Sequence, residues 1–476
     1  MLDREMATTA TRILSVNPAT EEVLASFEPF TQEQVEDALG QAEDAFQAWR
    51  SRSLSERAIP MRRLAKTLRD RSDRYGALIT QEMGKPISEA RAEIEKCAWA
   101  CDHFAEHAAR YLADEEIGST ARRSIVAFEP LGVILAVMPW NFPFWQLIRF
   151  AAPAFMAGNA ALMKHASNVP QCALALEEAF RDAGFPEGLL RAVLVGGSAI
   201  EPIIADQRIR GVTLTGSSST GSRIAELAGR ALKKTVLELG GSDPYIILAD
   251  ADLDAAATTG ARARNQNTGQ SCIAAKRFIA EGAVADEFER KFAKAVEALV
   301  VGDPMDPKTQ VGPLARRDLL EALERQVDES VRMGARVLTG GERVRGRGFF
   351  YRPTVIADVT GEMPVFREET FGPVAAVLRV RDAEEAARVA NDSAYGLGAS
   401  LWTRDPSLGE RLARKIESGS VFINGMVASD PRLPFGGVKQ SGYGRELSEF
   451  GIREFTNIKT IWVGPAEGQQ TAKPAE

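Results

Sequence analysis

A series of short apolar runs that alternate with helix-like segments constrains the fold of this chain more than any other feature. The runs cover residues 133–138, 161–164, 192–195, 212–215, 235–239 and 245–248. Several are apolar almost throughout, which is typical of strands buried on both faces of a parallel sheet. The segments between them, such as 171–183 and 220–232, have the length and composition of helices. This alternation predicts a doubly wound α/β domain.

The segments on either side of the alternation predict further helices and a second α/β region. In the N-terminal third, apolar side chains recur at helical spacing over 32–50, 56–75 and 86–113. Beyond residue 250, glycine- and proline-containing loops separate further helical runs at 284–300, 316–333 and 382–391. At about 100–200 residues per domain, 476 residues correspond to roughly two to four domains.

Charge and composition exclude several classes of protein. A net charge of −7 offers no general basic surface to nucleic acid or to an anionic membrane. Four cysteines in a long chain without a secretory signal predict a reducing, cytoplasmic location rather than a disulfide scaffold. The uncharged stretch 131–148 approaches the length of a membrane span, but Pro139, Asn141 and Pro143 would leave polar groups unsatisfied in lipid. We therefore expect a buried strand and a loop there, and neither a membrane nor a nucleic-acid partner.

A turn rich in glycine and serine follows the predicted strand 212–215. It runs from Gly216 to Gly221 as GSSSTG and leads into a predicted helix. Free backbone N–H groups and the helix dipole suit such a position to a phosphate. A serine that only caps the helix explains the pattern equally well. The turn alone leaves both interpretations open.

Cys272 lies in the small polar loop 267–272, and its role is open on residue type alone. A loop cysteine beside glycine is a better nucleophile candidate than a buried one, which behaves as an inert hydrophobe. A Cys–His pair would need His165, because the other two histidines, His103 and His107, lie in a predicted helix. Reactive and structural interpretations of Cys272 are equally supported.

Glu238 ends a predicted apolar strand. A carboxylate at such a position is costly to bury unless it is paired or functional. Ligands of open α/β sheets also bind at the carboxyl ends of the strands. Glu238 is therefore a candidate general base with a raised pKa, and a structural glutamate in a salt bridge is the alternative.

Two cysteines and two histidines, Cys97, Cys101, His103 and His107, have a spacing that suggests metal ligands. On a helix, at about 100° per residue, the cysteines share one face and the histidines point away from it by more than about 100°. Four such ligands cannot converge on one zinc ion. We expect a structural helix and no metal site.

Five motifs in one order make the chain similar, over nearly its whole length, to the NAD(P)-dependent aldehyde dehydrogenases. They are Pro139-Trp140-Asn141-Phe142-Pro143, Glu238-Leu239-Gly240-Gly241, Gly269-Gln270-Ser271-Cys272, Glu369-Thr370-Phe371-Gly372-Pro373 and Pro434-Phe435-Gly436-Gly437. Within the family, residues 164–167 and 429–434 resemble bacterial succinate-semialdehyde dehydrogenases. The resemblance implies an aldehyde dehydrogenase-like α/β fold with a Rossmann-type cofactor domain, an α/β catalytic domain and a β oligomerisation arm.

The same resemblance implies where these parts lie. Residues 1–120 and 139–240 would form the dinucleotide-binding domain, and 241–440 the catalytic domain. The arm would combine a β-hairpin over 121–138 with 451–463 and would join copies into a homodimer or homotetramer. The small polar residues of 464–476 predict a disordered tail.

By resemblance, three residues carry the chemistry. Cys272 would attack the aldehyde carbon to give a thiohemiacetal, which becomes a thioester after hydride transfer to the cofactor. The Asn141 amide, with the backbone N–H of Cys272, would hold the developing oxyanion. Glu238 would activate the water that releases the acid, so no histidine base is required. Glu446 is a candidate accessory proton-relay carboxylate.

The resemblance also implies the cofactor contacts. They are Trp140, Asn141, Lys164, Ser167, Gly216, Ser217, Gly221, Leu239, Glu369 and Phe371. Gly216 and Ser217 would meet the pyrophosphate, and Lys164 and Glu369 the two riboses. NAD-preferring relatives often carry a glutamate where Ser167 stands, and this glutamate would repel a 2′-phosphate. We therefore expect NADP as the preferred cofactor, with NAD possible.

The expected substrate is succinate semialdehyde, with Arg149 and Ser429 at positions that bind its distal carboxylate in similar enzymes. Gln266 stands where some members carry a second arginine, and Arg432 would either compensate or form only a surface ion pair. Ala274 stands where some members carry a second cysteine, so no disulfide switch is expected. Glutarate semialdehyde or a small neutral aldehyde are the alternative substrates. A cofactor-independent thioesterase, or a catalytically silent relative, is the alternative class.

Overall fold

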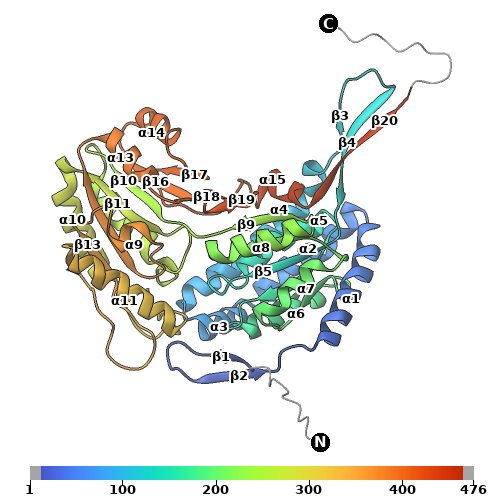
Figure 1. The fold of residues 1–476 in the computed structure, drawn as a ribbon, viewed down its shortest axis with the longest axis horizontal. Coiled ribbons are helices and arrows are strands. Elements are labelled where there is room, and N and C mark those ends of the chain that lie inside the picture. The colour runs from blue at the N-terminus through green and yellow to red at the C-terminus, as the bar shows by residue number, and fades with distance from the viewer. Residues whose placement is uncertain (1–11, 465–476) are drawn as a thin grey trace, which may run out of the picture.

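The computed structural model describes residues 12–464, and its two large sheets carry helices on their faces (Figure 1). The first sheet has six strands in the order β19-β9-β8-β5-β6-β7. They are β5 (Val133–Met138), β6 (Ala160–His165), β7 (Leu190–Ala192), β8 (Ile209–Thr215), β9 (Lys234–Glu238) and β19 (Gly442–Tyr443). All neighbours are parallel except β9 and β19. This sheet confirms the predicted α/β alternation.

Helices from the N-terminal third and from the crossovers cover the first sheet. The crossover helices are α5 (Trp145–Met156), α6 (Pro170–Asp182), α7 (Ile200–Ala205), which follows the 3-10 turn η1 (Gly197–Ala199), and α8 (Ser218–Arg230). The N-terminal helices are α1 (Gln32–Arg50), α2 (Leu54–Asp70), α3 (Ser72–Met83) and α4 (Ile87–Tyr111). The helix predicted over 56–75 is divided at Arg71 between α2 and α3. Every residue of α5 is buried, as its almost wholly apolar sequence favours.

The second sheet has seven strands in the order β12-β13-β14-β11-β10-β16-β17, all parallel except β12 and β13. They are β10 (Asp243–Ile247), β11 (Ala275–Glu281), β12 (Arg336–Thr339), β13 (Thr354–Ala357), β14 (Val374–Val380), β16 (Gly398–Trp402) and β17 (Ser420–Ile423). Its helices are α9 (Leu253–Asn265), α10 (Gly282–Glu297), α11 (Arg317–Arg332), α12 (Pro364–Arg367), α13 (Ala383–Asn391) and α14 (Pro406–Ala413). Both faces are buried, because Ile246 packs into one hydrophobic cluster and Tyr245 into another. The apolar run 245–248 therefore belongs to this second sheet.

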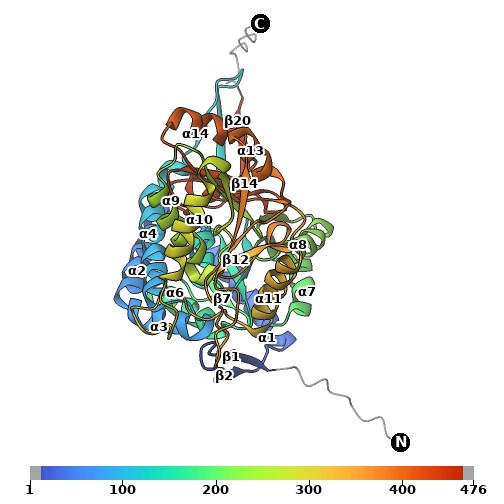
Figure 2. The same cartoon turned by 90° about the vertical axis from the view of Figure 1, so that its left-hand side faces the viewer.

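A three-stranded sheet projects from the body of the molecule in both views (Figures 1 and 2). In it, β4 (Arg123–Pro130) pairs antiparallel with β3 (Glu115–Glu116) and with β20 (Thr456–Val463). The hairpin expected over 121–138 is not formed, because β5 lies in the first sheet instead. The reason is that β5 is buried along almost its whole length, whereas β4 is buried at only two positions and can leave the body.

The remaining described elements are short. They are β1 (Ile13–Val16), β2 (Val23–Phe27), β15 (Tyr395–Gly396), β18 (Val438–Lys439), α15 (Ser448–Glu454) and the 3-10 turn η2 (Gln266–Gly269). Within residues 12–464, no helix is both long and apolar enough to cross a membrane. Residues 131–148 form β5, a loop and the start of α5, as expected. The tail predicted over 464–476 lies, from residue 465, outside the described residues.

Candidate active site

Cys272 lies in a loop that begins with the sharply bent turn η2 and ends at β11. Three successive residues of this loop, Asn267, Thr268 and Gly269, have φ values of 57°, 56° and 74°. A side chain at Gly269 would lie 2.4 Å from the backbone of Gly372, so only glycine fits there. The local sequence thus forces the chain into a tight path that ends at the thiol.

Two buried cations anchor this loop through its carbonyl groups. The Arg264 guanidinium donates to the carbonyl oxygen of Gly269 at 2.6 Å. The Lys276 ammonium donates to the carbonyl oxygens of Ser271 and Cys272 at 3.0 and 2.9 Å. Burial raises the pKa of the Cys272 thiol to about 12, although the positive charges of Arg149 and Lys276 oppose the shift. The resting thiol is therefore protonated, and the backbone that carries it is anchored.

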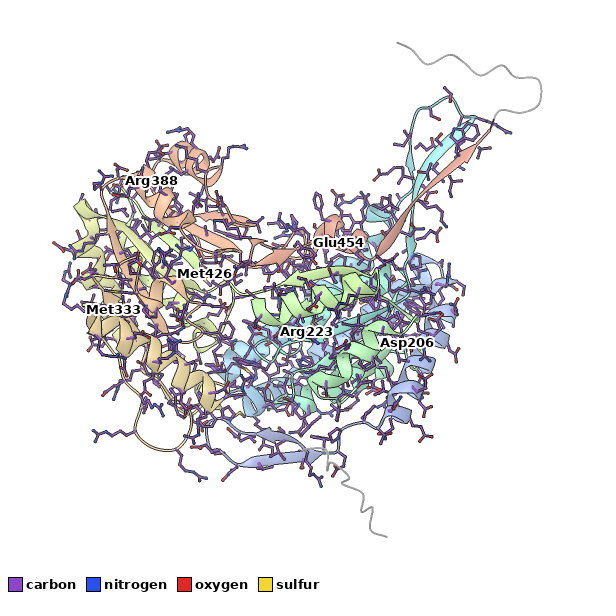
Figure 3. The ribbon with its side chains drawn as sticks, viewed as in Figure 1. Asp206, Arg223, Met333, Arg388, Met426 and Glu454 are labelled. Atoms are coloured by element: carbon purple, nitrogen blue, oxygen red, sulfur yellow. The ribbon has the colours of Figure 1, made fainter. Side chains whose placement is uncertain are left out.

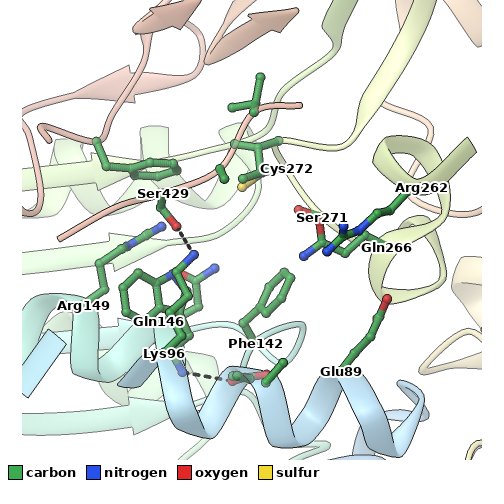
Figure 4. A pocket seen from close by; sticks show the side chains of 17 residues that line it. Glu89, Lys96, Phe142, Gln146, Arg149, Arg262, Gln266, Ser271, Cys272 and Ser429 are labelled. Atoms are coloured by element: carbon green, nitrogen blue, oxygen red, sulfur yellow. Dashed lines mark hydrogen bonds between the residues drawn. The ribbon is translucent and has the colours of Figure 1, made fainter. Parts of the chain in front are cut away.

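Cys272 lines two separate cavities. The first, here called the α8 cleft, lies between β8, the N-terminus of α8 and the loop around Phe371. The second, here called the α4 pocket, lies between α4, α5 and the loop after β17 (Figure 4). The α8 cleft is lined by Pro139, Trp140, Asn141, Thr215, Gly216, Ser217, Thr220, Leu239, Gly240, Cys272, Arg316, Leu319, Glu369 and Phe371. Cys272 thus borders both cavities, so a molecule bound in either one would lie beside it.

The α8 cleft has the features of a dinucleotide site. Gly216 follows β8 directly, and the Ser217 hydroxyl caps α8 by accepting from the N–H of Thr220 at 3.3 Å. A side chain at Gly221 would lie 2.5 Å from Leu239, so glycine lets the helix approach this wall of the cleft. Six of the predicted cofactor contacts besides Asn141 lie here: Trp140, Gly216, Ser217, Leu239, Glu369 and Phe371. The serine caps the helix, and both Ser217 and Thr220 of this helix start line the cleft.

A neighbouring cavity meets the cleft at Thr220 and contains Lys164 at the end of β6. Arg223 of α8, labelled in Figure 3, also lines it and forms an ion pair with Glu201 of α7 at 3.2 Å. Ser167 is exposed beyond β6 and lines neither cavity. Arg223 is a cation of this region that the sequence motifs did not indicate.

Asn141 is tied to the nucleophile loop by both its side chain and its backbone. Its amide donates to the carbonyl oxygen of Gln270 at 3.1 Å, and the Asn267 amide donates to the Asn141 carbonyl oxygen at 2.8 Å. The second hydrogen of the Asn141 amide is left for another acceptor. The loop that carries Cys272 therefore also fixes the orientation of Asn141.

Glu238 belongs to a buried cluster of charges with Arg149 and Glu446. Burial raises the pKa of Glu238 well above its ordinary value, Arg149 opposes this shift, and the negative charge of Glu446 adds to it. Within residues 12–464, neither Glu238 carboxylate oxygen has a hydrogen-bond partner. Glu446 instead forms an ion pair with Arg149. Glu238 itself lines neither the α8 cleft nor the α4 pocket.

The α4 pocket contains two of the three predicted substrate-binding residues, Arg149 and Ser429. Arg432 does not line it. This arginine forms an ion pair with Asp430 at 2.6 Å and is 66% exposed, which fits the alternative that it forms only a surface ion pair. The pocket is also lined by charged residues that the sequence motifs did not indicate, among them Glu89, Lys96 and Arg262.

The cysteine and histidine pairs of α4 lie within the packed helix. Cys97 and Cys101 are buried, and His103 contacts the Tyr111 hydroxyl at 3.2 Å while stacking on His107. Among the described residues, no group of three His, Cys, Asp or Glu side chains is arranged to hold a metal ion.

A thiol that borders both a nucleotide-type cleft and a second pocket, on paired α/β sheets, is the arrangement of a dinucleotide-dependent oxidoreductase. Comparison with known proteins makes this class specific. The model of the aldehyde dehydrogenase family matches residues 5–461, and the chain belongs to this family.

Similar proteins cover nearly the whole chain. A probable succinate-semialdehyde dehydrogenase [NADP(+)] of Synechocystis sp. is 51% identical over 95% of this chain and 99% of its own. A succinate semialdehyde dehydrogenase [NAD(P)+] of Escherichia coli is 48% identical over 96% of this chain and 98% of its own. The solved succinic semialdehyde dehydrogenase of Streptococcus pyogenes, in complex with NADP+, has a TM-score of 0.93 at 39% identity, over 95% of this chain and 100% of its own. The fold expected from the five motifs is thereby confirmed.

Proposed function

We propose that the chain oxidises succinate semialdehyde to succinate and reduces NADP. The observation that carries this proposal is that Cys272 borders both the α8 cleft and the α4 pocket. An aldehyde in the pocket and a dinucleotide in the cleft would then meet at one sulfur. The substrate and cofactor named for the relatives from Synechocystis, Escherichia coli and Streptococcus pyogenes support this choice.

Residues of the nucleophile loop perform the first step. The thiol of Cys272 gives its proton to a water molecule, its sulfur bonds to the aldehyde carbon, and the carbon–oxygen π bond breaks so that the carbonyl oxygen becomes an oxyanion. The free hydrogen of the Asn141 amide and the N–H of Cys272 hold this oxygen. When bound in the α8 cleft, NADP supplies a hydride acceptor, and a thioester on Cys272 is the product of that oxidation.

Glu238 performs the release step. Its raised pKa makes its carboxylate a stronger base than an exposed glutamate. It takes a proton from a water molecule, the water oxygen bonds to the thioester carbon, and the carbon–sulfur bond breaks. The departing sulfur regains the proton from Glu238, which gives succinic acid and the Cys272 thiol. Glu446, paired with Arg149, is the accessory carboxylate whose charge acts on Glu238.

Preference for NADP rests on Lys164 beside the α8 cleft. Lys164 lines the cavity that joins the cleft at Thr220 and would offer positive charge to a 2′-phosphate there. Arg223 lines the same cavity, but Glu201 pairs with it. Ser167 places no carboxylate beyond the end of β6. NAD lacks the 2′-phosphate and would not gain this charge pairing.

The division of the chain and its assembly are part of the same proposal. Residues 1–120 and 139–240, together with β5, serve as the cofactor domain, and 241–440 as the catalytic domain. The projecting sheet joins copies into a homodimer or homotetramer, because β20 is an edge strand with exposed apolar side chains such as Ile458 and Trp462. The assembly works in the cytoplasm.

The proposal is tested by following the reduced cofactor formed with succinate semialdehyde, NADPH from NADP and NADH from NAD. Cys272→Ala is the blank. Turnover with NADP that exceeds turnover with NAD and vanishes in Cys272→Ala is the expected result. Glutarate semialdehyde and butanal are run beside it. Faster turnover of either one would replace succinate semialdehyde as the substrate, and ester hydrolysis without nucleotide would indicate a thioesterase.

A further inference from the structure

Lys96 of α4 reaches into the α4 pocket and contacts the loop that follows β17. Its ammonium donates to the Ser429 hydroxyl at 2.7 Å and lies 4.5 Å from the centre of the Trp145 ring. Both Lys96 and Ser429 line the pocket that also holds Cys272 (Figure 4). The Ser429 oxygen accepts from Lys96, so its own hydrogen can be donated to a further acceptor.

Arg149, the cation expected to bind substrate, already has a carboxylate partner. It forms a buried ion pair with Glu446, donates to the Thr215 hydroxyl at 3.3 Å and lies 4.4 Å from the centre of the Phe435 ring. The Glu446 carboxylate compensates its charge. An incoming carboxylate would have to compete with this partner.

Lys96 has no such partner within residues 12–464, where no carboxylate oxygen lies within 4.0 Å of its nitrogen. The acids that act on it from further away are engaged elsewhere. Glu93 pairs with Lys85 and accepts the backbone N–H groups of Phe144 and Trp145. Asp430 pairs with Arg432. The positive charge of Lys96 is therefore available to a ligand.

The opposite side of the pocket is less favourable to an anion. Arg262 and Glu89 line it together (Figure 4), and Arg262 is exposed to solvent. Burial raises the pKa of the Glu89 carboxyl to about 7, against the N–H of Asn267, which it accepts at 2.7 Å, and the charges of Lys85 and Arg262. Of the three cations that line the pocket in the described part of the chain, Lys96 is thus the one that is neither paired with a carboxylate, as Arg149 is, nor exposed to solvent, as Arg262 is.

We propose that Lys96 and Ser429 bind the distal carboxylate of the substrate, and that Lys96, rather than Arg149, determines the preference for carboxylated over neutral aldehydes. This inference rests on the proposed function and adds a residue to it. The carboxylate would accept from the Lys96 ammonium and from the Ser429 hydroxyl, while the aldehyde carbon meets Cys272. Arg149 keeps its place beside Glu446 and Glu238.

The test compares kcat/KM for succinate semialdehyde with kcat/KM for butanal, which has the same chain length without the carboxylate. Lys96→Met removes the charge and keeps most of the side-chain length. The ratio of the two constants should fall about ten- to one hundred-fold, mainly through the KM of the carboxylated aldehyde, since a charge-assisted hydrogen bond is lost. Lys96→Arg should restore part of the ratio. Arg110→Met, which removes a positive charge from α4 outside the pocket, should leave the ratio unchanged.

The pH dependence of this ratio is a second readout. Burial, with the neighbouring charge of Arg149, lowers the pKa of Lys96 to about 8, while Cys97, Glu93 and Asp430 act in the opposite direction. Only the protonated ammonium binds the carboxylate, so the ratio should fall as the pH rises through about 8. Glu89 lines the same pocket and burial raises its pKa to about 7, so its ionisation also affects the ratio. In Lys96→Met the fall near pH 8 should be lost, and only the change that Glu89 causes near pH 7 should remain. Dividing by the butanal constant removes the pH dependence of Cys272 and of hydride transfer, which both aldehydes share.

The outcomes separate this inference from the proposed function. An unchanged ratio in Lys96→Met, together with a fall in Arg149→Met, would assign the carboxylate to Arg149 and overturn the inference alone. A wild-type preference for glutarate semialdehyde that Lys96→Met abolishes would overturn the proposed substrate and support the inference. A wild-type enzyme with no preference for any carboxylated aldehyde would contradict both.

Discussion

At Cys272, burial opposes ionisation of the thiol while Arg149 and Lys276 favour it, and burial prevails. The neutral thiol is the expected resting form because its pKa is raised to about 12. Arg264 and Lys276 hold the carbonyl groups of the same loop, so the backbone that carries Cys272 is anchored before any substrate arrives. The position of this backbone, rather than a permanently charged thiolate, thus prepares Cys272 for attack.

This protonation state predicts how Cys272 reacts with a small neutral alkylating reagent in the absence of cofactor. The thiolate fraction grows as the pH rises toward the raised pKa, so the alkylation rate should keep rising beyond about pH 9, where an ordinary thiol levels off. The measurement is the incorporation of reagent with time at each pH, followed by mass spectrometry of the intact protein, with Cys272→Ala as the control for modification of other residues. A rate that levels off near neutral pH would show a thiolate stabilised by its neighbours.

The site residues differ in how far the sequence could predict them. Cys272, Glu238 and Asn141 stand in motifs, so their neighbours along the chain indicate them. Lys96 stands on a long helix without a motif, and its contact with Ser429 joins residues 333 positions apart. Only the packing of α4 against the loop after β17 brings them together.

Among the helices, α8 shows how one glycine can shape a ligand cleft. Gly221 faces Leu239, and a methyl group there would lie 2.5 Å from the leucine side chain. Leu239 borders the cleft, so its displacement would narrow the space for the cofactor. The length and composition of residues 220–232 predicted the helix. The close approach of Gly221 to Leu239 depends on how the helix packs on β9.

Substitution of two glycines on α8 should therefore affect different properties: one the binding of NADP, the other the stability of the helix. Gly221→Ala should raise the KM for NADP several-fold, because Leu239 must move into the cleft. Gly229→Ala lies on the same helix with no atom within 4 Å of the added methyl group, and should raise stability by up to about 1 kcal/mol through helix propensity. Steady-state kinetics and thermal unfolding measure the two effects. Equal KM values in both variants would show that Leu239 yields without narrowing the cleft.

Over the whole molecule, sequence patterns predicted the strands of the first sheet, but for the second they indicated only an α/β region and its helices. Runs that are apolar almost throughout indicated the parallel strands, because burial on both faces selects an apolar residue at nearly every position. The same signal could not assign the run 245–248 to the second sheet or separate β5 from the arm. These assignments depend on hydrogen bonds between strands that are distant in sequence.

The projecting sheet predicts that the protein is an oligomer in solution. Ile458 and Trp462 of β20 are 65% and 55% exposed in a single chain, which is unfavourable unless another copy covers them. Replacement of both by aspartate should shift the assembly toward monomers in size-exclusion chromatography with light scattering. Lys459→Asp, on the opposite face of β20, is the control. A wild-type protein that is already monomeric would contradict the assembly.

The central claim, that Cys272 carries the acyl group between oxidation and hydrolysis, is tested most directly by trapping that group. Glu238→Gln is mixed with succinate semialdehyde and NADP, quenched with acid, digested and analysed by mass spectrometry. We expect one succinyl group on the peptide that contains Cys272. NADPH should form rapidly in the first turnover and slowly in the steady state. No adduct is expected without NADP or in Cys272→Ala. NADPH formation without an acylated Cys272 peptide, or with the acyl group on another residue, would contradict the central claim.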